Sequence, residues 1–238
     1  MAAMEEGQCQ GVRIAVLDSG IEIGHPDFRG RSLCDDMVVE LENFTPGEGE
    51  DVYGHGTAIA SIIWKLAPQA EIGSFRVLGP NLSARSALVA RAAEKAISLG
   101  YHILNCSFAC GLASHLALYK SWTDQAALKG VQVVAASGSH DFLRPEWPAH
   151  FATVLGVDCG AVAGLTHRGG SLIEFVAPGS DVPVAWRDRG HRLMTGSSFA
   201  AAHLTGLLGR ILAHHDLRDT LLTKALLREV SRTALQSL

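Results

Sequence analysis

The sequence has no excess of positive charge and few charged residues of either sign. Its 238 residues carry 20 Lys and Arg against 24 Asp and Glu, which gives a net charge of −4. A protein that binds nucleic acid through its phosphates needs a basic surface, so this balance argues against a nucleic-acid partner. No apolar run is long enough to span a bilayer, and the first residues are acidic where a signal peptide would be basic and then apolar. We therefore expect no membrane partner and a cytoplasmic protein.

Cysteine is also scarce, and its spacing is not that of a metal site or a disulfide framework. The five cysteines are an odd number, which favours reduced thiols. Apolar residues make up 47% of the chain and charged residues 18%, a balance typical of a compact core rather than of disorder. We expect an N-terminal tail over residues 1–11 and a single domain over residues 12–238. The cysteines are Cys9, Cys34, Cys106, Cys110 and Cys159.

Short β-branched runs alternate with helical periodicity along the chain. The runs predict buried strands over residues 11–17, 70–77, 101–106 and 131–136. Helices are predicted over residues 55–66, 83–99, 114–129, 198–214 and 216–238, with Ser83 as the N-cap of the second. This alternation indicates an α/β fold with a mostly parallel sheet covered on both faces by helices. Chemistry in such sheets collects beyond the carboxyl ends of the strands, where Asp18 and Asn105 lie.

Three polar residues stand at element ends with glycine nearby, and each has an ordinary structural interpretation. Ser198, or Ser197 beside it, is typical of a helix N-cap. Asp18 is typical of a turn after a strand. His55 opens a helix with glycines on both sides, which would leave its ring approachable, but a lone histidine seldom has a catalytic role.

Taken together, the three stretches resemble the motifs of the subtilisin-like serine proteases, the subtilases. Asp-Ser-Gly lies at 18–20, Gly-His-Gly-Thr at 54–57 and Gly-Ser-Ser-Phe-Ala at 196–200, in the chain order of that family. The resemblance covers about residues 12–215. It implies a subtilisin-like three-layer fold with a mostly parallel central sheet. It also implies a serine endopeptidase in which Ser198 is the nucleophile, His55 the general base and Asp18 its orienting carboxylate.

The expected oxyanion hole departs from the family pattern. The resemblance assigns one donor to the backbone N–H of Ser198. It places Ser139 where the family usually has asparagine, with His140 next to it. A hydroxyl is shorter than a carboxamide, and removing this donor from a member of the family slows catalysis about 10²- to 10³-fold.

The resemblance also implies a peptide-binding cleft. An extended substrate would lie between the backbone around Gly79 and the 107–109 stretch, by β-strand addition. Glu146 is placed at the base of the S1 pocket, where a carboxylate favours a basic residue before the scissile bond (P1). The alternative is that Glu146 pairs with Arg144 on an exposed turn. The implied substrate-binding residues are Gly79, Ser107, Phe108, Ala109, Ala136, Ser137, Gly138 and Glu146.

Extracellular members of the family insert a calcium-binding loop after Gly-His-Gly-Thr, which this chain lacks, so we expect no metal and no cofactor. Two other functions stay open. One is a catalytically weak, peptide-binding pseudoenzyme, suggested by Ser139. The other is a peptide ligase or macrocyclase acting on a precursor peptide, in which an amine resolves the acyl-enzyme. The oligomeric state is left open.

Overall fold

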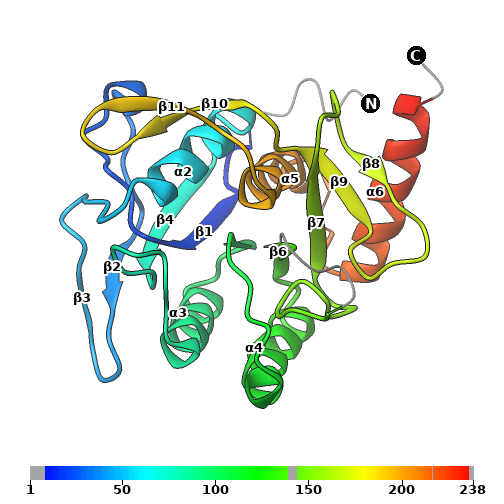
Figure 1. The fold of residues 1–238 in the computed structure, drawn as a ribbon, viewed down its shortest axis with the longest axis horizontal. Coiled ribbons are helices and arrows are strands. Elements are labelled where there is room, and N and C mark those ends of the chain that lie inside the picture. Colours follow the sequence, from blue (N-terminus) through cyan, green and yellow to red (C-terminus); the bar gives the residue numbers. More distant parts are fainter. Residues whose placement is uncertain (1–8, 139–143, 216, 236–238) are drawn as a thin grey trace.

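The computed structural model describes residues 9–138, 144–215 and 217–235. Its centre is a nine-stranded sheet in the order β3-β2-β4-β1-β5-β6-β7-β9-β8 (Figure 1). Neighbouring strands are parallel except for β2–β3 and β8–β9 at the two edges. The mostly parallel α/β sheet expected from the sequence is therefore confirmed. The strands are β1 (Arg13–Asp18), β2 (Asp36–Val39), β3 (Phe44–Pro46), β4 (Glu71–Arg76), β5 (Ile103–Cys106), β6 (Gln132–Ala136), β7 (Leu155–Gly160), β8 (Thr166–His167) and β9 (Phe175–Pro178).

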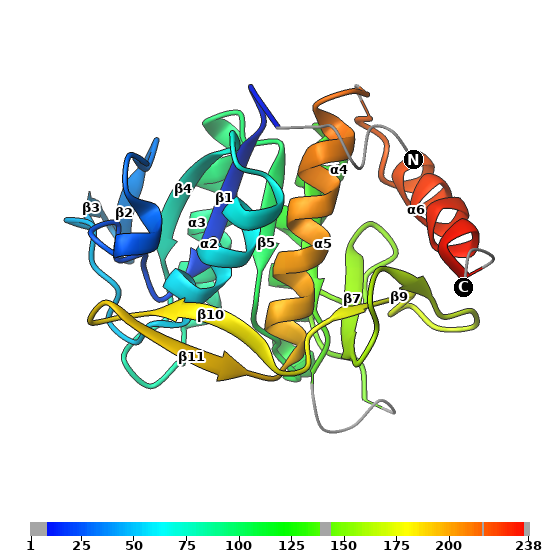
Figure 2. The same ribbon diagram turned by 90° about the horizontal axis from the view of Figure 1, so that it is seen from above.

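Helices cover both faces of this sheet. On one face α2 (His55–Leu66) packs against α5 (Ser197–Leu212), and the other face carries α3 (Ser86–Ser98) and α4 (Leu116–Leu128) (Figures 1 and 2). The last helix, α6 (Thr220–Leu235), packs beside β8 at one edge. A separate hairpin of β10 (Val182–Trp186) and β11 (Gly190–Met194) lies against α2. Two short 3₁₀ turns, η1 (Pro26–Phe28) and η2 (Ala113–His115), complete the elements.

The side chains of β1 show why both faces must be covered. Ile14 and Val16 point into the core beneath α2 and α5, whereas Ala15 and Leu17 point into the core on the α3 and α4 side. All four side chains are buried. A central parallel strand buried on both faces is therefore a continuous apolar run, which is what made this strand visible in the sequence.

The sequence placed the elements of the first half of the chain better than those of the second. The helix expected from residue 83 begins at Ser86 with Arg85 at its N-cap, so Ser83 is not the cap. The Ser83 hydroxyl instead donates to the side-chain oxygen of Asn81 at 2.7 Å, within the preceding turn. The strands not predicted are β2 and β3 at one edge of the sheet, β7, β9 and β8 at the other side, and the β10–β11 hairpin.

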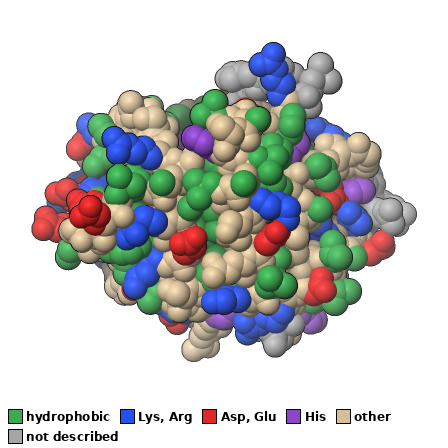
Figure 3. All heavy atoms as spheres, turned by 90° about the horizontal axis from the view of Figure 1, so that it is seen from below, with side chains coloured by type: hydrophobic (Ala, Val, Ile, Leu, Met, Phe, Trp, Pro, Cys, Tyr) green, Lys and Arg blue, Asp and Glu red, His purple; other side chains and the backbone are tan. Residues whose placement is uncertain are grey.

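Charges of both signs are interspersed on the face that carries α3 and α4 (Figure 3). Figure 3 shows the face on which α3 and α4 lie, where acidic, basic and hydrophobic side chains alternate. A nucleic-acid site needs basic side chains gathered on one surface, which this face does not offer. Among the described helices, none combines the length and the apolar character needed to cross a bilayer.

Candidate active site

A buried carboxylate–imidazole pair lies at the carboxyl end of the central strand. Asp18 is the last residue of β1 and His55 is the first residue of α2. Nδ1 of His55 lies 2.8 Å from Oδ1 and 3.0 Å from Oδ2 of Asp18. Asp18 is 1% exposed and His55 is 7% exposed. A carboxylate that accepts from Nδ1–H fixes the imidazole tautomer and leaves Nε2 as the basic nitrogen.

Glycines allow Asp18 and His55 to meet. A Cβ on Gly56 would lie 2.1 Å from the carbonyl oxygen of Gly20. Because Gly56 has no side chain, the first turn of α2 can pack directly against the turn that follows β1. Gly54 is the N-cap of α2 with a φ of 112°, a left-handed conformation that glycine adopts without strain. Most of the His55 ring is buried, and whether the flanking glycines also give access to its Nε2 stays a prediction.

Asp51 organises this end of the site, and the sequence reasoning missed it. Its Oδ1 accepts from the Ser19 hydroxyl at 2.8 Å and from the Gly54 N–H at 2.7 Å. Its Oδ2 accepts from the N–H and the hydroxyl of Thr57 at 2.8 and 2.6 Å. The carboxylate thus satisfies donors in the first turn of α2 and joins them to the turn after β1. An aspartate four residues before His55, just ahead of a helix, was the available signal.

The pKa of His55 is raised above its ordinary value by the balance of opposing effects. Burial by itself lowers this pKa, because it disfavours the charged ring. The negative charge of Asp18 and its hydrogen bond raise the pKa by more, and the charge of Asp51 adds to them. The site therefore stabilises the imidazolium form, which is the form a general base takes when it accepts a proton.

Ser198 is the second residue of α5, and the start of this helix lies against the histidine. The N-cap of α5 is Gly196 and no side chain caps the helix, so the N-cap interpretation of Ser197 and Ser198 is wrong. The Ser197 hydroxyl donates to the carbonyl oxygen of Ser137 at 2.6 Å. Phe199 packs its ring 5.7 Å from the ring of His55, measured between centroids. The start of α5 and the start of α2 are thereby held together.

The Ser198 hydroxyl donates to the carbonyl oxygen of Ser107 at 3.2 Å. No hydrogen bond joins it to His55 in the described chain. Apo active sites often hold their catalytic hydrogen bonds in loose arrangements that tighten when substrate binds.

The backbone N–H of Ser198 faces no backbone acceptor within the described residues, as is typical of the first turn of a helix. A donor in this position, at the positive end of α5, is available to an anion. Ser139 and His140, the expected side-chain donors, lie outside the described residues. Gly138, which precedes them, is described.

An antiparallel bridge between Cys110 and Trp147 positions Glu146, the residue expected at the base of the S1 pocket. The N–H of Cys110 donates to the Trp147 carbonyl and the N–H of Trp147 donates to the Cys110 carbonyl, each at 2.9 Å. This bridge sets Glu146 beside the 107–111 segment. A Cβ on Gly138 would lie 1.1 Å from Oε2 of Glu146, and a Cβ on Gly111 would lie 3.8 Å from Oε1. The carboxylate therefore occupies the space that Gly138 leaves open and lies within ordinary van der Waals distance of the Gly111 position.

The alternative, an exposed pair of Glu146 with Arg144, is not what the structure contains. Glu146 is half-buried against Gly138, and the described residues show no ion pair between it and Arg144. Where the pocket walls are described, they come from two strand ends, with Ser107 after β5 and Ser137 after β6. Ala136 is the last residue of β6, and Phe108 and Ala109 follow Ser107.

Gly79 uses its own backbone groups within a turn. Its N–H donates to the Ser83 carbonyl at 3.0 Å, and its carbonyl accepts from the Leu82 N–H at 3.0 Å. A peptide on this side of the cleft would therefore pair with neighbouring backbone groups. The role of Gly79 in substrate binding stays a prediction.

The sequence of this chain is similar to those of known proteins of one family. A model of the subtilase family matches residues 9–237. Subtilisin Savinase from Lederbergia lenta is 32% identical over 212 residues, covering 82% of this chain and 74% of that protein. M-protease from Shouchella clausii (strain KSM-K16) is 32% identical over 213 residues, covering 83% of this chain and 53% of that protein. The chain thus spans about half the length of some relatives it matches and about three quarters of others.

A solved structure shows the same fold. The crystal structure of a cold adapted subtilisin-like serine proteinase superposes with a TM-score of 0.80 at 24% sequence identity. The alignment covers 94% of this chain and 83% of that one. The expected subtilisin-like α/β fold is confirmed.

Proposed function

We propose that this chain, which belongs to the subtilase family, is a serine endopeptidase with Ser198 as its nucleophile. The observation that carries the proposal is the buried Asp18–His55 pair, with 2.8 Å between Oδ1 and Nδ1, next to the helix end that bears Ser198. A carboxylate, an imidazole and a hydroxyl in these positions are the components of nucleophilic acyl transfer.

In the proposed reaction, a bound peptide bond displaces the Ser198 hydroxyl from the Ser107 carbonyl. His55 Nε2 accepts the hydroxyl proton as Ser198 Oγ attacks the carbonyl carbon, and Asp18 stabilises the resulting imidazolium. His55 then donates that proton to the leaving amine, which leaves an acyl-enzyme. A water molecule, deprotonated by His55, attacks the acyl carbon and releases the acid and the Ser198 hydroxyl.

The negative charge on the tetrahedral intermediate needs donors that are already in place. One proposed donor is the Ser198 N–H, which lies in the first turn of α5 and has no backbone acceptor among the described residues. Ser139 or His140 is the proposed second donor, from the segment after Gly138.

Peptide cleavage by the full chain tests this function. A mixture of peptides is incubated with the wild type, with Ser198→Ala and with the matched control Ser98→Ala, which removes an exposed hydroxyl on α3. We expect cleavage by the wild type and the control and none by Ser198→Ala. Cleavage that survives in Ser198→Ala would refute Ser198 as the nucleophile.

The same products separate hydrolysis from ligation. Hydrolysis adds one water to each cleaved bond, whereas a macrocyclase product is lighter than its hydrolysed counterpart by one water. Cyclised products would move the assignment to a peptide ligase. A folded wild type that binds peptides and cleaves none would move it to a pseudoenzyme.

We also propose a preference for Arg or Lys at P1. The half-buried Glu146 carboxylate supports this, because it lies against Gly138, which belongs to one of the two segments expected to form the pocket walls. Within the described residues, no Lys or Arg forms an ion pair with that carboxylate, which leaves it available to a cationic substrate side chain. A P1 scan tests the preference, which is wrong if Leu or Phe peptides are cleaved as fast as Arg peptides.

We also propose a cytoplasmic location. All five cysteines are thiols in the structure, and reduced thiols are typical of proteins in the reducing cytoplasm. Fractionation of cells that produce the full chain tests it. Recovery with the cytosolic fraction supports the proposal, and recovery from the medium or a membrane fraction contradicts it.

A further inference from the structure

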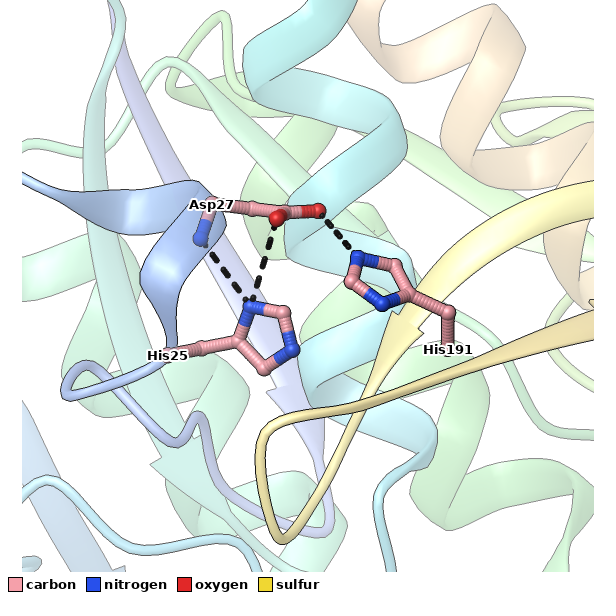
Figure 4. A group of neighbouring side chains, drawn as sticks. All are labelled: His25, Asp27 and His191. Carbon is pink, nitrogen blue, oxygen red and sulfur yellow. Dashed lines mark hydrogen bonds and ion pairs between the residues drawn. The ribbon is translucent and has the colours of Figure 1, made fainter.

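Two histidines and an aspartate meet where η1 lies against the β10–β11 hairpin, outside the site described above. His25 precedes η1, Asp27 lies within it, and His191 belongs to β11 (Figure 4). One ligand atom from each residue lies within 4.8 Å of the other two. Nε2 of His191 is 3.0 Å from Oδ2 of Asp27, and Nδ1 of His25 is 3.8 Å from Oδ1 of the same carboxylate. Both rings therefore present a nitrogen to one carboxylate.

The orientation of His25 is fixed by its surroundings. Its side chain is fully buried, and its Nε2 lies 2.9 Å from the carbonyl oxygen of Gly190, so Nε2–H donates to that carbonyl. The lone pair then belongs to Nδ1, which accepts a 3.2 Å hydrogen bond from the Asp27 N–H. Metal-binding histidines commonly donate their other ring N–H to a backbone carbonyl in this way, which fixes the ring and raises its basicity.

We propose that His25, Asp27 and His191 bind a divalent transition-metal ion, with Zn²⁺ as the best match. Two neutral imidazoles and one carboxylate suit Zn²⁺ better than Ca²⁺ or Mg²⁺, which take oxygen ligands. Ligands at about 2.0–2.2 Å from a tetrahedral ion lie roughly 3.4 Å apart, so the cluster must contract. Asp27 and His191 have side chains that are 44% and 61% exposed, and they can rotate toward the buried His25. Water completes the fourth position from the solvent side.

Binding has one identifiable cost and one structural consequence. The ion displaces the hydrogen bond from the Asp27 N–H to Nδ1 of His25, and that N–H turns to solvent beside the exposed carboxylate. In return, the ion links the segment that follows β1 to the strand that precedes α5. The metal would therefore fasten together the chain segments next to Asp18 and Ser198, without contacting either residue.

Titration with Zn²⁺ alone tests the site, using the full chain after treatment with a chelator. Calorimetry should give one ion bound per chain, and a hundredfold excess of Zn²⁺ over the dissociation constant should raise Tm by about 5 °C. Both His191→Ala and Asp27→Asn should weaken binding at least about tenfold. His214→Ala is the matched control, because it removes an exposed histidine at the end of α5 and should leave binding unchanged.

The readouts are separate from peptidase activity, so they hold whether or not the proposed function does. Retained binding in both His191→Ala and Asp27→Asn would overturn the proposal and place the ion elsewhere, for example on the exposed Cys34. If Zn²⁺ does not bind to the wild type, the cluster is only an ion pair between His191 and Asp27, and the proposal is also overturned. Loss of binding in His191→Ala with an unchanged Tm in the absence of metal would support it, since that variant is then still folded.

Discussion

Replacing Glu146 with glutamine should remove most of the proposed preference for a basic P1 residue. Two unit charges about 4 Å apart interact by about 4 kcal/mol at an effective dielectric constant near 20. Glu146 is only half-buried, so screening and side-chain ordering reduce the net gain to about 1.5–3 kcal/mol. The ratio of kcat/KM for Arg over Leu peptides should therefore fall about 10- to 100-fold in Glu146→Gln.

The assay compares kcat/KM for peptides that differ only at P1, with Arg, Lys, Leu and Phe in turn. The matched control is Glu94→Gln, which removes an exposed carboxylate on α3 and should keep the wild-type ratio. Because a glutamine amide has nearly the same shape as the carboxylate it replaces, cleavage of Leu peptides should change little. An Arg-to-Leu ratio that is equal in the wild type and Glu146→Gln would refute the electrostatic reasoning.

Three further perturbations test the catalytic pair, the contact that forms it and the attachment of α6. Asp18→Asn should lower kcat by about 10³- to 10⁴-fold. His55 acts as a base only in its neutral form, and Asp18 raises the pKa of His55. The kcat/KM of the wild type should therefore rise with pH above 6.5, whereas the kcat/KM of Asp18→Asn should rise at a lower pH. Identical pH profiles would contradict this. Gly56→Ala places a Cβ 2.1 Å from the Gly20 carbonyl oxygen, so it should destabilise the folded protein by about 1–3 kcal/mol in a urea titration and reduce activity by a larger factor. Gly164→Ala is the control and should be neutral, because its Cβ would have no atom within 4 Å. Glu174→Gln leaves the buried Lys224 without its carboxylate partner and should cost about 3 kcal/mol, again measured by urea unfolding.

Glu174 also gives the protein a predictable acid sensitivity. Burial raises its pKa, but hydrogen bonds and charges from Lys224 and Arg228 lower it by more, so the net pKa is depressed. A depressed carboxyl pKa contributes stability that is complete above the ordinary value of about 4.5 and is lost as pH falls through the folded-state value. The stability difference between the wild type and Glu174→Gln should therefore shrink below about pH 4.5. A difference that is constant from pH 7 to pH 3 would contradict this assignment.

The sequence predicts most of the central elements, though not β7, because their burial leaves a local pattern. Strands such as β1 and β6 are continuous apolar runs, and α2 and α5 begin at glycine-containing motifs. The β10–β11 hairpin leaves no such pattern. Its turn places Asp188 and Arg189 at positive φ, where glycine or asparagine would have signalled it, and β11 is largely exposed.

The site was predictable to the extent that its residues lie in short motifs. Asp18, His55 and Ser198 could be singled out because each belongs to a recognisable stretch beside glycine. Asp51 carried only the weak signal of an aspartate just ahead of a helix, because its role depends on contacts with Ser19 and Thr57 that only the folded turn creates. Likewise, the place of the Glu146 carboxylate depends on the bridge between Cys110 and Trp147, a long-range pairing with no local signal.

Labelling with a fluorophosphonate probe shows whether Ser198 is an activated nucleophile, because the probe reacts with an activated serine and requires no knowledge of the substrate. The adduct is mapped by mass spectrometry in the wild type, Ser198→Ala and His55→Ala, with Ser98→Ala as control. We expect an adduct on Ser198 in the wild type and the control and none in the other two variants. A folded wild type that stays unlabelled, or that carries the adduct on another serine, would contradict it.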